Sequence, residues 1–146
     1  MTPEAIERVK SSYAALPAEG RRLSARFYQE LFAVSPNLRP LFPADLTTLQ
    51  GHFEAALALV VRNLNDVGGL HAALRDLGAQ HVHWGARPED YVTARESLVT
   101  AIGSLAPVWD ANLEQDWRDA ITAIVVSMLE GAAVHTAMMA ERLAAE

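Results

Sequence analysis

The residue with the clearest chemical potential in this sequence is His81. It follows Leu77 by four positions and Leu74 by seven, so on a helix it continues an inward-facing apolar stripe. A buried imidazole must be hydrogen-bonded, and position alone favours an ordinary core histidine bonded to a backbone carbonyl. The functional alternative is a metal ligand, because neutral imidazole can offer one nitrogen to iron while the other donates to a partner that orients the ring.

Several other kinds of reactive site are missing from the sequence. It contains no Gly-rich phosphate loop, no HExxH and no GxSxG, and its carboxylates lie mainly at expected helix starts or on polar faces. The absence of cysteine excludes disulfides, thiolate metal ligands and a cysteine nucleophile, and agrees with a reducing cytoplasm. The net charge of -6 argues against a nucleic-acid partner, whose binding needs clustered Lys and Arg.

The elements that must position His81 are all expected to be helices. Apolar residues recur at spacings of three and four along the chain, and no repeat or linker interrupts it. A length of 146 residues suits one domain with its own core. We therefore expect a single all-α domain over residues 1–146, with about seven helices.

Local signals predict where these helices begin and end. Helix starts are predicted at Thr2-Pro3, Pro17, Leu46, Leu70, Pro88 and the capping-box pair Asn112 and Gln115, and helix ends at Ser35-Pro36, Asn65 and Gly85. The longest strongly apolar run, residues 120–129, is about half of the ~20 residues that a spanning helix needs, so we expect core and no membrane span. The first residues show no secretory signal pattern, which favours a cytoplasmic location.

Three stretches in the right order resemble the bacterial globins. They are Phe27-Tyr28-Gln29-Glu30-Leu31-Phe32, then Arg39-Pro40-Leu41-Phe42, then Leu77-Gly78-Ala79-Gln80-His81 followed by Gly85, Pro88, Glu89 and Tyr91. The nearest resemblance is to the globin domain of flavohaemoglobins and to single-domain bacterial haemoglobins, and it covers nearly the whole chain. It implies a globin fold, a three-over-three helical sandwich around haem.

Carried over by position, the resemblance implies a b-type haem with His81 as the proximal iron ligand. Phe42 becomes the aromatic residue against the porphyrin, and Tyr28 the distal tyrosine whose hydroxyl can donate to a gas ligand. The other cofactor-binding residues that it implies are Leu49, His52, Phe53, Leu77, Gln80, Tyr91, Leu98 and Ile121. Ordinary core packing is the alternative for Phe42, and a hydroxyl at the surface is the alternative for Tyr28.

The distal helix departs from the family pattern. Related globins place a glutamine or a histidine opposite the ligand, whereas an ungapped alignment places Leu49 there, with Gln50 one residue away and Phe53 one turn later. A shorter connection after Phe42 or a locally wound helix could turn Gln50 inward, so both alternatives stay open. His52 has three interpretations: an exposed residue, a partner of a haem propionate, or a sixth iron ligand.

The proximal side departs from the pattern as well. Tyr91 matches the tyrosine that helps a glutamate hold the ligand histidine in flavohaemoglobins, but the glutamate position falls on Ala132. Glu130 lies two residues away and is expected to face elsewhere. Without that carboxylate the imidazole gains less anionic character, and peroxidase-like or dioxygenase chemistry should be weaker.

The function that the resemblance implies is reversible binding of a diatomic gas at the haem iron. Dioxygen is the first expected ligand, with carbon monoxide and nitric oxide as others, and the chain is expected to be a monomer or homodimer. One alternative is nitric oxide dioxygenation supported by a separate reductase. A second alternative is a gas or redox sensor module.

Overall fold

The first helix begins as its sequence predicts. Thr2 caps it, since its Oγ1 accepts a hydrogen bond of 3.1 Å from the backbone N–H of Ala5. Pro3 occupies the first turn, where its missing N–H costs nothing, and Glu4 favours the positive end of the helix dipole. The α1 helix then runs over Pro3–Ala14.

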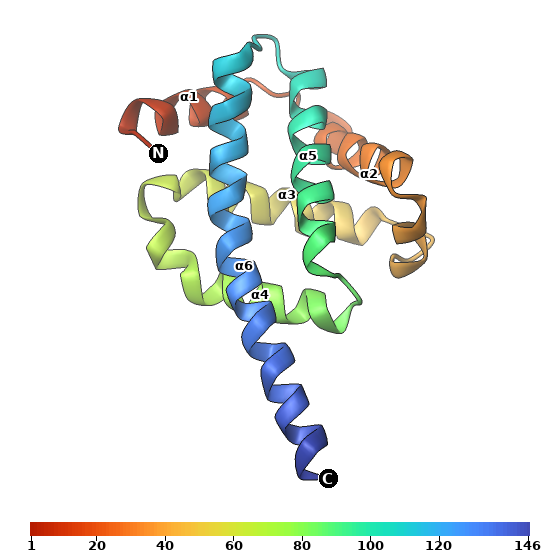
Figure 1. Cartoon of the computed structure of the whole chain (residues 1–146). Coiled ribbons are helices and arrows are strands. Elements are labelled where there is room, and N and C mark those ends of the chain that lie inside the picture. The colour runs from red at the N-terminus through yellow and green to blue at the C-terminus, as the bar shows by residue number, and fades with distance from the viewer.

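The rest of the chain is also helical. The computed structural model describes residues 1–146, except for the burial of Gly20. Figure 1 shows its helices crossing one another at steep angles. The other α-helices are α2 (Arg22–Val34), α3 (Thr47–Arg62), α4 (His71–His83), α5 (Pro88–Leu105) and α6 (Ala111–Ala145). Three short 3₁₀ segments join them: η1 (Glu19–Arg21), η2 (Pro36–Leu41) and η3 (Leu64–Leu70). The prediction of an all-α globin fold is confirmed.

Several predicted boundaries are wrong. Pro17 does not start the second helix, which begins at Arg22 after η1. The third helix ends at Arg62 and not at residue 65, because the chain tightens into η3 before the two glycines. The last helix is capped by Asp110, whose carboxylate accepts from the N–H of Leu113 at 2.8 Å, and not by the predicted capping-box pair Asn112 and Gln115.

Several of the most deeply buried core side chains come from α1, α5 and α6. The largest fully buried side chains include Trp117 of α6, Ile102 of α5 and Val9 of α1. The indole N–H of Trp117 donates to the hydroxyl of Ser12 at 3.1 Å, so the buried ring leaves no polar atom unpaired.

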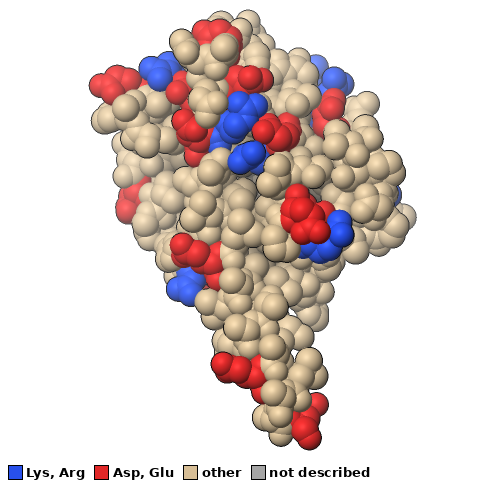
Figure 2. Space-filling model, in the orientation of Figure 1, with Lys and Arg blue, Asp and Glu red and all other residues tan. Residues whose placement is uncertain are grey.

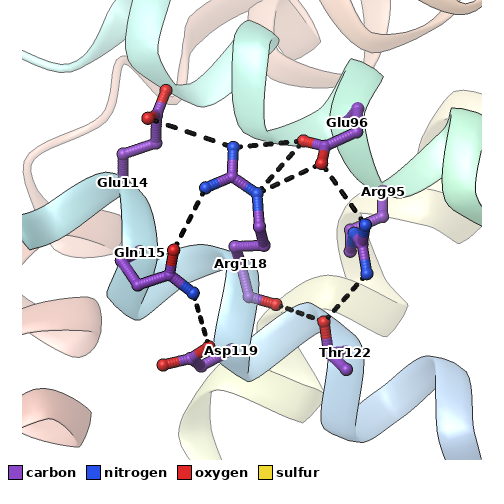
Figure 3. Close-up of polar contacts among 7 residues, drawn as sticks. All are labelled: Arg95, Glu96, Glu114, Gln115, Arg118, Asp119 and Thr122. Atoms are coloured by element: carbon purple, nitrogen blue, oxygen red, sulfur yellow. Dashed lines mark hydrogen bonds and ion pairs between the residues drawn. The ribbon is translucent and has the colours of Figure 1, made fainter. Parts of the chain in front are cut away.

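A polar cluster joins α5 to α6 at the edge of this core (Figure 3). Arg118 of α6 donates to the Glu96 carboxylate at 3.1 Å, and Arg95 donates to the same carboxylate at 3.3 Å. Arg95 also donates to the hydroxyl of Thr122 at 3.3 Å. The cluster fixes the two helices by charge-assisted bonds where apolar packing ends.

The α6 helix is much longer than the body that it crosses. Its final turns project beyond α4, and Figure 2 shows few charged groups on that projecting end. By length and hydropathy alone α6 could cross a membrane, which is weak evidence because core helices of soluble proteins meet the same criterion. Its first half carries Trp117, Ala120 and Ile121, which are all buried in the protein core.

Candidate functional site

His81 lies in the last turn of α4, and one of its ring nitrogens is already hydrogen-bonded. Its Nδ1 lies 2.7 Å from the carbonyl oxygen of Leu77, one turn earlier. A carbonyl can only accept, so Nδ1 carries the proton and Nε2 keeps its lone pair. Burial lowers the pKa of His81, although the bond to Leu77 raises it, so the ring is neutral at pH 7. This is the electronic state that a metal ligand requires.

Two aromatic residues surround the His81 ring. The ring of Trp84 lies 5.1 Å away between centroids, and that of Tyr91 in α5 lies 6.0 Å away. The Tyr91 hydroxyl is buried and has no hydrogen-bond partner among the described residues. Burial also raises the pKa of Tyr91, so its hydroxyl stays protonated. An unpaired buried hydroxyl beside the imidazole is unusual, because such groups cost stability.

Tyr28 of α2 stands at the centre of an aromatic cluster. Its ring lies 5.7 Å from Phe42 in an edge arrangement, 5.9 Å from Phe32 and 6.1 Å from Phe53. Phe27 stacks on Phe53 at 4.7 Å. The Tyr28 side chain is 6% exposed, and burial raises its pKa, so the hydroxyl is a neutral donor. The structure therefore brings the rings of Tyr28, Phe42 and Phe53 together.

The position of α3 relative to Tyr28 is fixed by contacts with the start of α2. Arg21 donates to the carbonyl of Thr47 at 2.7 Å and lies over Gly51, where a Cβ would stand 3.3 Å from its guanidinium. The backbone N–H of Ser24 donates to the Glu54 carboxylate at 2.9 Å. These bonds hold the register of the helix that carries the distal candidates.

Along α3 the candidates have different environments. Leu49 and Phe53 are half-buried and pack against the core, and Gln50 is half-buried as well. His52 is exposed. The half-buried apolar residues Phe42, Leu49, Phe53 and Leu77 leave part of their surface uncovered by protein. Such incompletely covered apolar surface is what an apolar cofactor could bury.

Three other predicted cofactor residues differ in burial. Leu98 and Ile121 are buried in the core, at 7% and 5% exposure. Gln80 is exposed on α4. A helical stripe predicts which residues face inward, but it cannot separate those that face the core from those that face a cofactor.

The proximal side has one acidic candidate, Glu130, and an alanine at position 132. The Glu130 carboxylate lies 3.1 Å from Nε2 of His71 at the start of α4. Ala132 is buried in α6 and can supply no carboxylate. No local sequence pattern predicts the contact between His71 and Glu130, because the two residues are 59 positions apart in the chain.

The residues present fit a haem better than a metal ion held by protein alone. The described part of the chain has no cluster of three or more His, Asp or Glu that could hold an ion. One neutral imidazole is nevertheless sufficient for haem, because the porphyrin supplies the other four nitrogen ligands itself. A surface groove between α1 and the start of α6 contains none of the predicted residues.

A sequence profile of the globins matches residues 25–128, which include both Tyr28 and His81. This chain belongs to the globin family. Flavohemoprotein of Vibrio cholerae is 25% identical over 124 residues, covering 82% of this globin and 32% of that protein. A globin-like protein of Aquifex aeolicus is 26% identical over 102 residues, covering 70% of this chain and 73% of that one. The globin thus spans about a third of the flavohemoprotein that it matches.

Solved structures show the same fold. A bacterial globin from Campylobacter jejuni superimposes with a TM-score of 0.79 at 21% identity, covering 90% of this chain and 96% of that one. An engineered carbene transferase derived from a nitric oxide dioxygenase candidate of Rhodothermus marinus gives a TM-score of 0.84 at 25% identity, covering 96% and 99%. The six helices of this globin therefore occupy a known arrangement.

Proposed function

We propose that this globin holds one b-type haem through His81 and reversibly binds a diatomic gas, dioxygen first. The observation that carries the proposal is the His81 ring itself. Its Nδ1–H is bonded to Leu77, its charge is suppressed by burial, and its Nε2 lone pair remains available. Membership of the globin family supports haem as the group that this nitrogen binds.

The residues around the haem have separate tasks. The haem supplies the gas-binding chemistry, and the protein supplies orientation and exclusion of water. Phe42, Leu49, Phe53 and Leu77 offer incompletely covered apolar surface, whose burial against a porphyrin would keep water out. Tyr28 offers a protonated hydroxyl as a hydrogen-bond donor to the gas ligand.

A titration with hemin tests this function. The purified chain is reconstituted, passed over a desalting column, and examined by absorption as isolated, after reduction, and after exposure to carbon monoxide. We expect one haem per chain, a strong Soret band, and a carbon monoxide spectrum typical of a histidine-ligated haem. A chain that stays colourless after hemin treatment would refute the proposal.

A second candidate function is nitric oxide dioxygenation. It is favoured by the similarity to flavohemoproteins and to the Rhodothermus marinus protein. Against it, the position at which the family resemblance implies a glutamate is Ala132, and the Glu130 carboxylate lies against His71. Nitrate formation from nitric oxide, measured with and without an added reductase and reductant, distinguishes turnover from single-round binding. Sustained nitrate production only with the reductase would favour the enzyme.

A further inference from the structure

The α4 helix, which carries His81, touches α6 backbone to backbone. A Cβ added at Gly78 would stand 1.9 Å from the carbonyl oxygen of Met128. A Cβ added at Gly131 would stand 1.9 Å from the carbonyl oxygen of Arg75. Two glycines on opposite helices therefore permit a contact that no other residue type allows, because ordinary contacts of a Cβ begin at 3.4 Å.

This crossing is the main support of α4. Among the elements that the structure describes, α6 is the only α-helix whose backbone approaches α4, and its other neighbour is η3, which directly precedes it. The α3 helix, which carries the distal candidates, makes no such approach. The place of His81 relative to the rest of the protein is therefore set by how closely α4 lies on α6.

A second contact fixes the start of the same helix. His71 is bonded through Nδ1 to the hydroxyl of Ser127 at 3.0 Å and through Nε2 to the Glu130 carboxylate at 3.1 Å. Both partners lie in the stretch of α6 that meets Gly78. Together with the glycine crossing, this polar contact prevents α4 from sliding or rotating on α6.

We propose that Gly78 and Gly131 are positioning residues that set the distance of His81 from the haem iron. Gly78 precedes His81 by three residues and directly follows Leu77, whose carbonyl holds the imidazole. A methyl group at either glycine forces the helices apart by roughly 1.5 Å and moves the imidazole with them. The inference rests on the proposed haem function, but the close contact itself exists in the haem-free chain.

Gly78→Ala and Gly131→Ala test the proposal directly. Two control variants separate positioning from general loss of stability. Gly68→Ala adds a methyl group with no neighbour closer than 3.9 Å, whereas Gly103→Ala meets the Trp109 ring at 2.8 Å, far from α4 in the chain. The readouts are the iron–histidine stretching band of the ferrous protein by resonance Raman spectroscopy and the rate of hemin loss.

Both crossing variants are expected to shift the iron–histidine band and to lose hemin at least tenfold faster. Both controls are expected to keep the wild-type band. An unshifted band in the crossing variants, or an equal shift in Gly103→Ala, would overturn the proposal. If the crossing variants do not fold, His71→Ala loosens the start of α4 without adding atoms and is expected to shift the band in the same sense, and an unchanged band there would also overturn it.

Amide hydrogen exchange in the haem-free chain keeps the two proposals separable. Each crossing variant is expected to exchange faster in α4 while α5 stays protected. If the crossing variants lose protection selectively in α4 and the wild-type chain fails to bind hemin, the contact between α4 and α6 is supported and the haem function is refuted. If the variants exchange faster than wild type to the same extent in α4 and in α5, the proposal about the crossing is refuted, whatever the hemin titration shows.

Discussion

Individual residues in this globin are informative where a polar group is buried. His81, Tyr28 and Tyr91 are polar side chains among apolar neighbours. His81 is bonded to Leu77, whereas the Tyr91 hydroxyl has no partner among the described residues. The apolar stripe predicted the inward position of His81, and the ordinary interpretation predicted its carbonyl bond. The two features are compatible, because Nδ1 can donate to the Leu77 carbonyl while Nε2 stays available as a ligand.

The Tyr28 hydroxyl should control how fast a gas ligand leaves. Tyr28→Phe removes a donor with a net contribution of about 1.5 kcal/mol, so oxygen release should become roughly tenfold faster. Stopped-flow measurement of oxygen dissociation checks this. Tyr13→Phe is the matched control, because the Tyr13 ring packs against Trp117 of α6, with 6.4 Å between ring centroids, and is not part of the aromatic cluster around Tyr28. An unaltered rate in Tyr28→Phe would show that the hydroxyl does not reach the ligand.

The Tyr91 hydroxyl should cost stability in the haem-free chain. It is buried without a partner among the described residues, so Tyr91→Phe removes an unsatisfied group and keeps the ring. We expect the free energy of unfolding of the haem-free chain to stay constant or rise by up to about 1 kcal/mol in urea denaturation. A loss of more than about 1 kcal/mol would mean that the hydroxyl has a partner after all.

Whole elements were predictable where local chemistry decides them. Thr2, Pro3 and Pro88 start helices as predicted, because caps and proline act within one turn. Pro17 and the Asn112 and Gln115 pair failed, since a 3₁₀ turn and the stronger Asp110 cap lie close by. The contact of Gly78 with α6 could not be predicted, because a glycine in a helix shows its purpose only when the neighbouring backbone is known.

The bond between Arg118 of α6 and Glu96 of α5 predicts how the free energy of unfolding changes at acid pH. The bond from Arg118 to Glu96 holds the pKa of that carboxyl below its ordinary value of 4.5, so Glu96 is ionised in the folded state to lower pH than in the unfolded chain. Its contribution to stability is therefore complete above pH 4.5 and disappears as the pH falls through the lowered pKa.

Glu96→Gln should therefore reduce the free energy of unfolding at pH 7, by no more than about 1 kcal/mol because the pair is partly exposed. The difference from wild type should shrink as the pH falls below 4.5. Urea denaturation over a pH series measures it. Glu89→Gln is the control, since Glu89 forms only an exposed pair with Arg87. A difference that stays constant with pH would mean that the carboxylate charge is not responsible.

At the scale of the molecule, composition and periodicity were enough for the fold class. Half of the residues are apolar and recur with the period of a helix, and helices of this length can bury them only against one another. The division between core and cofactor surface could not be predicted in this way. Leu98 and Phe53 occupy equivalent inward positions in sequence, yet Leu98 is buried in the protein core and Phe53 is left partly uncovered.

The projecting end of α6 should contribute little to stability. Residues 136–146 are all exposed, so a chain that ends at Thr136 loses no buried side chain. Its melting temperature should fall by no more than about 3 °C. A chain that ends at Glu130 also loses buried Gly131 and Ala132, and should melt much earlier. A large drop in the first variant would mean that the projecting end packs against another surface in solution.

The bond between His81 and haem iron is the claim on which the rest depends. Haem content of His81→Ala after hemin reconstitution and gel filtration tests it most directly, with His83→Ala as the control because His83 is exposed two residues further along. We predict that His81→Ala retains far less than one haem per chain, whereas His83→Ala retains the full amount. Full haem content and an unchanged ferrous spectrum in His81→Ala would contradict the account.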